Sequence, residues 1–203
     1  MRPPRLEHVT LAMLAGGAGS RMGTPKSLLS VGDTPILTFL MQRLAWPGPT
    51  LLITSPGREK PPGAEQFQHE ACDAVADEGP LRGVYTALTH ATTPMLVIVG
   101  VDMPAVAPDD LAWFVKELAA RPAAAGVMAS RGDAQIEPLP CALRPQRALG
   151  LVSDHLAAGR RSLHGLAKDG EITLADASAL PERLWTNVNT PGDWGRFLSN
   201  GLA

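Results

Sequence analysis

The sequence predicts an α/β fold, with one mainly parallel sheet flanked by helices. Three observations carry this prediction. Short apolar runs alternate with segments of helical periodicity along the chain. Met95–Val101 is a continuous aliphatic run of the kind that is buried on both faces of a parallel sheet. No internal repeat or long linker divides the 203 residues, so we expect a single domain over 1–203.

The expected strands are short apolar runs that end at glycine, proline or polar residues. In chain order they are His8–Leu14, Leu28–Val31, Leu51–Thr54, Cys72–Ala76, Met95–Val101, Ala124–Ala129, Leu139–Leu143 and Leu184–Val188. Of these, Cys72–Ala76 has the least apolar pattern.

The expected helices begin at prolines, whose fixed φ and missing N–H suit the first helical turn. They start at Thr34-Pro35, Pro80, Pro108, Pro145 and Thr190-Pro191, and two of them are expected to end at Ala91 and Ala158. The acids that follow Pro108 also suit the positive end of a helix dipole.

Composition excludes several classes of protein. Hydrophobic residues make up 45% and charged residues 19%, which is typical of a globular chain rather than a disordered one. A net charge of −2 gives no basic excess for nucleic-acid binding. No apolar run approaches the ~20 residues of a membrane span. The N-terminal residues lack a secretory pattern, so the cytoplasm is the expected location.

The two cysteines, Cys72 and Cys141, stand far apart in the sequence and have no metal-like spacing. One disulfide is an open alternative, but two buried cytosolic thiols are the favoured interpretation.

The glycine-rich stretch Leu14–Lys26 follows the first expected strand. Glycines let the backbone approach a phosphate and offer N–H groups to anionic oxygens. A dinucleotide fingerprint that begins at Gly17 and Gly19 would need a third glycine where Met22 stands. A P-loop would need Gly23 to be followed by Lys and then by Ser or Thr, but Thr24 and Pro25 follow it instead.

Two cations lie in this stretch of a mildly acidic chain. Arg21 is able to grip phosphate oxygens with two N–H groups, and Lys26 acts as a compact point charge. The competing interpretation is a strand-to-helix turn that carries two surface cations.

Four candidate positions follow expected strands. These are the Gly16 loop, Thr54, Asp77 and Asp102. Because ligands of parallel sheets bind outside the carboxyl ends of the strands, we expect all four on one rim.

Asp102 directly follows the clearest strand, where it suits a Mg²⁺ ligand. The alternative is that it caps the loop before Pro104. Asp77 has two open interpretations: it contacts the ribose or base, or it caps the helix at Pro80. Asn189 completes the metal shell or binds the acceptor, while Thr190-Pro191 also starts a helix.

Arg160-Arg161 is a cationic pair that suits the phosphate of an acceptor. A solvated helix end is the alternative, and the sequence slightly favours it.

Taken together, the motifs resemble the molybdenum-cofactor guanylyltransferases, the MobA family. The matching stretches occur in the right order over nearly the whole chain: Leu14-Ala15-Gly16-Gly17, Ser20-Arg21-Met22-Gly23, Lys26, Gly79-Pro80-Leu81 with Gly83, Asp102-Met103-Pro104, and Asn187-Val188-Asn189-Thr190-Pro191. The resemblance implies a Rossmann-like nucleotidyltransferase domain. It also implies transfer of GMP from GTP to the molybdopterin-type molybdenum cofactor, with pyrophosphate released.

The resemblance implies a set of site residues. Catalytic roles fall on Arg21, Lys26 and Asp102, and Mg²⁺ would be held by Asp102 and Asn189. Nucleotide contacts fall on Leu14, Ala15, Gly16, Gly17, Lys26, Thr54, Asp77, Pro80, Leu81, Gly83 and Asp102. Residues 1–105 would form the nucleotide-binding half and 106–203 the acceptor-binding half.

The double glycine at Gly16-Gly17 is similar to the guanylyl branch, since the related cytidylyltransferases tend to have Ala-Gly there. Two features depart from the family. Thr54 stands where an Asn is frequent, and the connection from Asp77 to Gly79 is short. Both departures lie near the expected position of the base and ribose, so they bear on which nucleotide the protein uses.

The expected partners are GTP, the molybdenum cofactor and transient cofactor-delivery or insertion proteins, without nucleic acid or membrane. The alternatives are CTP on the same acceptor, or a nucleoside triphosphate on a sugar phosphate. A non-catalytic nucleotide sensor and an adaptor protein are more distant alternatives.

Overall fold

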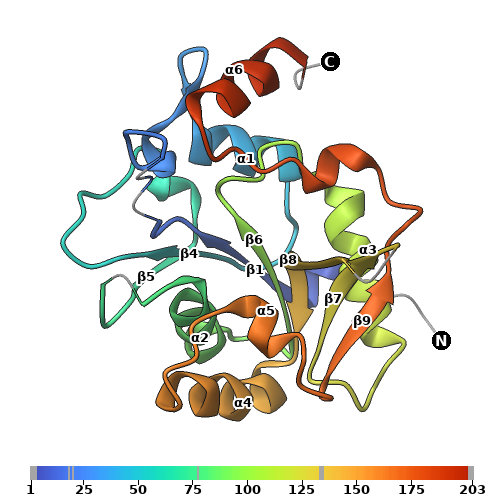
Figure 1. The fold of residues 1–203 in the computed structure, drawn as a ribbon. Coiled ribbons are helices and arrows are strands. Elements are labelled where there is room, and N and C mark those ends of the chain that lie inside the picture. Colours follow the sequence, from blue (N-terminus) through green and yellow to red (C-terminus); the bar gives the residue numbers. More distant parts are fainter. Residues whose placement is uncertain (1–3, 18, 20, 77, 133–134, 201–203) are drawn as a thin grey trace.

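The structure is a computed structural model that describes residues 4–17, 19, 21–76, 78–132 and 135–200 (Figure 1). Within these residues, seven strands form one sheet in the order β5-β4-β1-β6-β8-β7-β9. Their bounds are β1 Val9–Leu14, β4 Thr50–Thr54, β5 His69–Cys72, β6 Met95–Gly100, β7 Gly126–Arg131, β8 Gln135–Leu143 and β9 Ile172–Asp176. β8 runs antiparallel to both of its neighbours, and the other neighbouring strands are parallel. The expected mainly parallel α/β sheet is confirmed.

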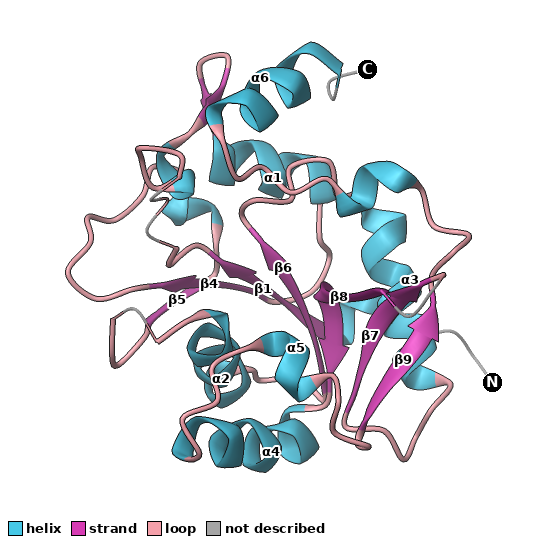
Figure 2. Cartoon of the chain, viewed as in Figure 1, coloured by secondary structure: helices cyan, strands magenta, loops and turns pink. Residues whose placement is uncertain are grey.

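Helices cover both faces of the sheet (Figure 2). Their bounds are α1 Ile36–Leu44, α2 Pro80–His90, α3 Pro108–Ala119, α4 Pro145–Ala157, α5 Leu163–Leu166 and α6 Pro191–Asn200. Short 3-10 turns lie at η1 Leu6–His8, η2 Lys26–Leu28, η3 Ala64–Gln66 and η4 Glu182–Trp185. Helices α2, α4 and α5 pack on one face of the sheet, and α1 and α3 pack on the other. None of the helices in the described part of the chain is long and apolar enough to cross a bilayer.

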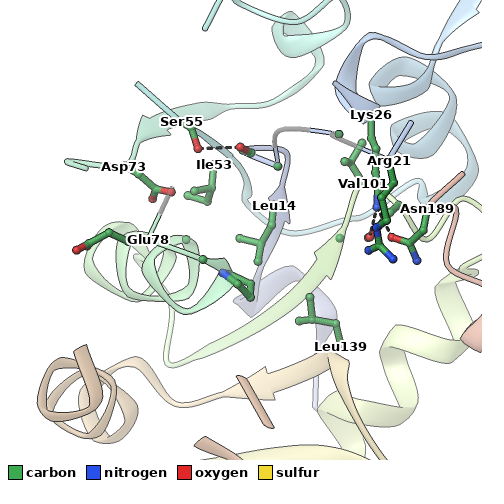
Figure 3. A pocket seen from close by; sticks show the side chains of 18 residues that line it. Leu14, Arg21, Lys26, Ile53, Ser55, Asp73, Glu78, Val101, Leu139 and Asn189 are labelled. Atoms are coloured by element: carbon green, nitrogen blue, oxygen red, sulfur yellow. Dashed lines mark hydrogen bonds and ion pairs between the residues drawn. The ribbon is translucent and has the colours of Figure 1, made fainter. Parts of the chain in front are cut away.

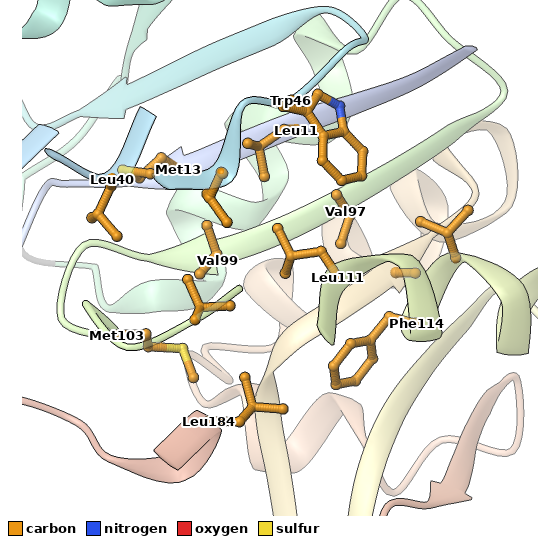
Figure 4. Packing of buried hydrophobic residues seen from close by; sticks show 14 of the residues in the cluster. Leu11, Met13, Leu40, Trp46, Val97, Val99, Met103, Leu111, Phe114 and Leu184 are labelled. Carbon is orange, nitrogen blue, oxygen red and sulfur yellow. The ribbon is translucent and has the colours of Figure 1, made fainter. Parts of the chain in front are cut away.

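The core forms because successive strand residues point to opposite faces of the sheet. Leu11 and Met13 of β1 lie in the cluster that contains α1 and α3, as Figure 4 shows, whereas Ala12 packs in the cluster on the α2 side. Phe114 of α3 is fully buried in the first cluster. Burial on both faces therefore accounts for the mainly apolar sequence of β1 and the unbroken apolar run of β6.

The carboxyl ends of the central strands lie level with one another. Leu14, the last residue of β1, pairs with Ile53 of β4 and with Gly100 of β6. The chain moves outward from β1 through β4 to β5, and then returns to the other side of β1 with β6. This reversal makes a topological switch point at the end of β1, where ligands of open α/β sheets bind.

Two strand predictions are wrong, and one strand was not predicted. Leu184–Val188 is not a strand: η4 occupies its start, and the Val188 N–H donates to the Asp102 carbonyl at 2.8 Å instead of to a ladder. The edge strand beside β7 is β9, which the sequence did not predict. Helix α5 was also not predicted. The strand expected over Cys72–Ala76 lies earlier, as β5, because Leu51 to Thr54 of β4 pair with His69 to Cys72.

Smaller differences occur elsewhere. Thr34-Pro35 forms β3, which pairs with β2 (Ser30–Val31), and α1 begins only at Ile36. Both cysteines are free, and Cys141 is buried as expected; burial raises the pKa of its thiol to about 12. Cys72 is exposed, so the prediction that it is buried is wrong, since β5 is an edge strand.

Candidate active site

A cavity of about 390 Å³ opens at the carboxyl ends of β1, β4, β5 and β6 (Figure 3). Its volume lies within the range of small-molecule sites. All of its described lining residues except Leu139 and Asn189 come from residues 14–102. The lining residues are Leu14, Gly16, Gly17, Gly19, Arg21, Lys26, Ile53, Ser55, Asp73, Glu78, Gly79, Pro80, Gly83, Gly100, Val101, Asp102, Leu139 and Asn189.

The glycine loop is tied to both neighbouring strands at its start. The Ala15 N–H donates to the Ile53 carbonyl at 2.8 Å, and the Leu14 carbonyl accepts from the Val101 N–H at 3.0 Å. The Ser55 hydroxyl donates to the Gly16 carbonyl at 2.9 Å, and a Cβ on Gly16 would lie 2.3 Å from that hydroxyl oxygen. A side chain at position 16 would displace the Ser55 hydroxyl, so Gly16 permits this close approach of the loop backbone to Ser55.

Lys26 lies at the centre of the cationic end of the cavity. Its Nζ donates to Asp102 Oδ2 at 2.8 Å and to Asn189 Oδ1 at 2.7 Å, as Figure 3 shows. The side chain of Lys26 is 16% exposed and that of Asp102 is 30% exposed. Arg21 lines the same end. Two cations and a glycine backbone together suit a chain of phosphates.

The segment before α6 brings Asn189 to this end of the cavity. The Val188 N–H donates to the Asp102 carbonyl, so this segment is attached directly to the loop after β6. Asp193 then accepts from the backbone N–H groups of Asn189 and Thr190 at 3.0 and 2.8 Å. Its hydrogen bonds with Thr190 and Asn189 lower the pKa of Asp193 to about 2. The expected helix start at Thr190-Pro191 is confirmed, and it also fixes the backbone of Asn189.

The opposite end of the cavity is acidic. Asp73 follows β5 and is buried, and the Thr86 hydroxyl of α2 donates to its Oδ1 at 2.6 Å. Burial raises the pKa of Asp73 above its ordinary value. Figure 3 places Asp73 and Glu78 on the far side of Leu14 and Ile53 from Lys26. The cavity therefore has a cationic end and an acidic end with an apolar floor between them.

Glu78 forms the rim at the acidic end. It pairs with Arg82 of α2, and Arg161 Nη2 lies 3.3 Å from its Oε1. Gly79 precedes α2 with a φ of 76°, and a Cβ there would lie 3.2 Å from the Arg161 carbonyl. Arg160 and Arg161 are exposed, and Arg161 reaches Glu78 rather than the Lys26 end.

Most of the expected site residues line one cavity. Those that do are Leu14, Gly16, Gly17, Arg21, Lys26, Pro80, Gly83, Asp102 and Asn189. Three others do not line it. Ala15 and Leu81 are buried in the two core clusters, and Thr54 lies between the lining residues Ile53 and Ser55. Asp77 lies outside the described residues.

Sequence reasoning missed Ser55 and Asp73. Ser55 directly follows β4, which ends at Thr54 as predicted, but the site residue was assigned to Thr54 itself. Asp73 follows β5, which ends at Cys72 and not at Ala76 as predicted. The parallel pairing of Thr54 with Cys72 brings Asp73 level with Ser55. The only signal in the sequence was the polar residue after each apolar run, and it depended on strand boundaries.

Comparison with known proteins agrees with this geometry. Residues 11–172 match the model of the MobA-like NTP transferase domain. The chain is 35% identical over 193 residues to a probable molybdenum cofactor guanylyltransferase of Deinococcus radiodurans, covering 95% of each chain. It is 32% identical over 187 residues to a molybdenum cofactor guanylyltransferase of Vibrio cholerae, covering 91% of this chain and 89% of the relative.

The fold agrees with a solved structure as well. The crystal structure of molybdopterin-guanine dinucleotide biosynthesis protein A from Archaeoglobus fulgidus superposes with a TM-score of 0.77 at 18% identity, covering 94% of this chain and 97% of that one. The glycine loop, Lys26, Asp102 and Asn189 gather where such a fold binds its ligand. The chain belongs to the MobA-like NTP transferase family of nucleotidyltransferases.

Proposed function

We propose that the protein transfers GMP from GTP to the molybdopterin-type molybdenum cofactor, forming the guanine dinucleotide and releasing pyrophosphate. The polarity of the cavity is the observation that carries this proposal. Arg21 and Lys26 lie at one end and Asp73 at the other. A nucleoside triphosphate has the matching polarity, with anionic phosphates at one end and hydrogen-bond donors on the base and ribose at the other.

Asp73 favours guanine among the bases. A carboxylate is an acceptor, and the Thr86 hydroxyl holds this one in place. Guanine presents adjacent N1–H and N2–H donors, whereas adenine and cytosine place an acceptor beside their exocyclic amine. We therefore assign the nucleoside contact to Asp73, where the resemblance had suggested Asp77.

The reaction is an in-line displacement at the α-phosphorus. An oxygen of the acceptor's terminal phosphate forms the new P–O bond, and the bond to the β-phosphate oxygen breaks, so that pyrophosphate leaves with the electron pair. Because the acceptor phosphate is already anionic at neutral pH, no strong general base is required. Arg21 and Lys26 neutralise the charge that develops on the leaving group.

The residues at the cationic end fit a divalent cation. Asp102 Oδ2 and Asn189 Oδ1 converge on one point that a positive charge already occupies, and both are oxygen donors of the kind that Mg²⁺ prefers. Mg²⁺ held there would supply charge neutralisation at the α-phosphate. Asp102 and Asn189 are the residues that would hold it.

Residues 1–105 are proposed to bind the nucleotide, and the later residues to complete the site for the acceptor. Leu139 of β8 and Asn189 are the described lining residues that the later part contributes. Asn189 lies beside Lys26 at the cationic end in Figure 3, where the acceptor phosphate must arrive.

The first test is calorimetry of the purified protein with GTP, CTP, ATP and UTP in the presence of Mg²⁺. We expect GTP to bind at least about tenfold more tightly than the other three, because guanine alone offers two adjacent donors to Asp73. Pyrophosphate release on addition of the molybdenum cofactor then tests transfer. Preference for CTP would assign the protein to the cytidylyl branch, and binding without pyrophosphate release would indicate a nucleotide sensor.

Replacement of Asp73 by Asn is expected to weaken GTP binding about tenfold near neutral pH, because one acceptor becomes a donor. The raised pKa means that Asp73 takes up its proton at a higher pH than an exposed aspartate does. The advantage of the wild-type protein should therefore shrink as the pH falls from about 7 to about 4, since protonation removes the negative charge and turns one of the two acceptor oxygens into a donor, as in Asn.

Titrating GTP into both proteins across this range measures the ratio of their affinities. Protonation of the GTP phosphates cancels in that ratio, because both proteins bind the same nucleotide. A ratio that stays constant with pH would remove Asp73 from guanine recognition.

A further inference from the structure

Lys26 connects parts of the chain that are far apart in sequence. Its ammonium donates to Asp102, 76 residues later, and to Asn189, 163 residues later. A lysine that is 16% exposed must keep its charge paired, and this pair of oxygens provides the pairing. The two oxygens and the nitrogen form one compact group at the cationic end of the cavity (Figure 3).

The position of the ammonium is also the position proposed for a divalent cation. Asp102 Oδ2 and Asn189 Oδ1 lie 2.8 and 2.7 Å from Nζ, which are hydrogen-bond distances. Mg²⁺ requires oxygens at about 2.1 Å, so these ligands would have to close in around it. A divalent ion and the ammonium cannot both sit between these two oxygens.

We propose that Lys26 is a resident cation that holds the divalent-metal position in the ligand-free protein and leaves it during nucleotide binding. This inference rests on the proposed function, because it concerns the same Asp102 and Asn189. Without a bound metal, the ammonium keeps the two oxygens together and offsets the charge of Asp102. Nucleotide phosphates then attract Lys26 away, and the freed oxygens are available to the ion that accompanies them.

Two consequences follow from this exchange. The ligand-free protein binds a divalent ion weakly, because the ion must displace a paired ammonium. Metal and nucleotide binding assist each other, since each favours the arrangement in which Lys26 has left Asp102 and Asn189. The exchange therefore favours binding of the divalent ion together with the triphosphate over binding of the ion alone.

The test is a titration of the full chain with Mn²⁺ alone, followed by electron paramagnetic resonance, without nucleotide. Lys26→Met keeps the length of the side chain and removes the ammonium, so it should bind Mn²⁺ at least about tenfold more tightly than the wild-type protein. Arg21→Met is the matched control. It removes an exposed cation of the same cavity that makes no hydrogen bond to Asp102 or Asn189 in the structure, and should change the affinity by less than about threefold. The proposal is overturned if Lys26→Met binds Mn²⁺ no more tightly than Arg21→Met.

A second measurement uses the wild-type protein and does not depend on the folding of a variant. Acylation of lysine amines, read by mass spectrometry, should become faster at Lys26 when Mn²⁺ is added, because the displaced ammonium leaves its partners. Lys168 is the internal control: it is exposed and does not line the cavity, so it should react at an unchanged rate. Unchanged or slower acylation of Lys26 would contradict the exchange.

These measurements contain neither GTP nor acceptor. A protein that failed to prefer GTP would still show the exchange at Lys26, and loss of the exchange would leave the GTP preference intact. The two proposals therefore fail separately.

Discussion

Replacing Asp102 by alanine is expected to reduce turnover by about two to three decades while the fold stays intact. The side chain carries the carboxylate at the phosphate end of the cavity, where it receives the Lys26 ammonium at 2.8 Å. Without it, Lys26 loses one partner and the proposed metal loses its charged ligand. Losses of this size are typical when an electrostatic group that acts on the transition state is removed.

The backbone around Asp102 should keep its place in the variant. The Asp102 carbonyl still accepts from the Val188 N–H, and β6 still ends at Gly100 between β1 and β8. We therefore expect near-normal thermal unfolding together with the loss of pyrophosphate release from GTP and the molybdenum cofactor. Asp102→Asn, which keeps the size of the side chain, should lose most of the same activity, because the charge is what is required.

Asp109→Ala is the matched control, since Asp109 is exposed at the start of α3 and lies outside the cavity lining. It should retain activity within about twofold, as expected of a surface substitution. If Asp102→Ala also retained activity within that range, Asp102 would have no place in the mechanism.

Replacing Arg183 by alanine is expected to lower the free energy of unfolding by about 3 kcal/mol. Asp110 of α3 is 2% exposed and receives two hydrogen bonds from Arg183, at 2.6 Å to Oδ2 and 3.2 Å to Oδ1. Arg183 also donates to the Ala105 carbonyl at 2.9 Å. Without Arg183, the buried Asp110 carboxylate keeps the hydrogen bond from the Ala107 N–H but loses the guanidinium that compensates its charge. Burial of an uncompensated charge is costly.

The reverse substitution, Asp110→Ala, should cost less. Arg183 is 42% exposed, so water is able to solvate the guanidinium that remains. What is lost is mainly the bond from the Ala107 N–H to Asp110 at the start of α3, which contributes about 1 kcal/mol. In the double variant, much of the penalty of Arg183→Ala should disappear, because no buried charge is left.

Chemical denaturation of the three variants measures these differences. Arg196→Ala is the control: Arg196 is 76% exposed and pairs with Asp193 one helical turn away, so its loss should change stability by about 0.5 kcal/mol or less. A value for Arg183→Ala as small as that would show that the Asp110 pair contributes little. The pair also joins the loop after Asp102 to the segment that leads to Asn189, so a destabilised Arg183→Ala should bind GTP more weakly as well.

The sequence by itself determined the centre of the molecule. The runs that became β1 and β6 are apolar because both of their faces are buried, and that burial leaves a local signal. Prolines marked the starts of α2, α3, α4 and α6 because their missing N–H is needed by no partner there. The glycine loop and Asp102 were found because each directly follows one of these two apolar runs in the sequence.

The tertiary structure alone decided the edges of the sheet and the composition of the site. An edge strand is chosen by the hydrogen bonds that its neighbour offers, so Ile172–Asp176 became β9 while Leu184–Val188, which has as many apolar residues, did not become a strand. The register of β5 on β4 likewise placed Asp73 on the rim. The contact of Lys26 with Asn189 spans 163 residues, and no local pattern records which distant oxygen will meet an ammonium once the chain has packed.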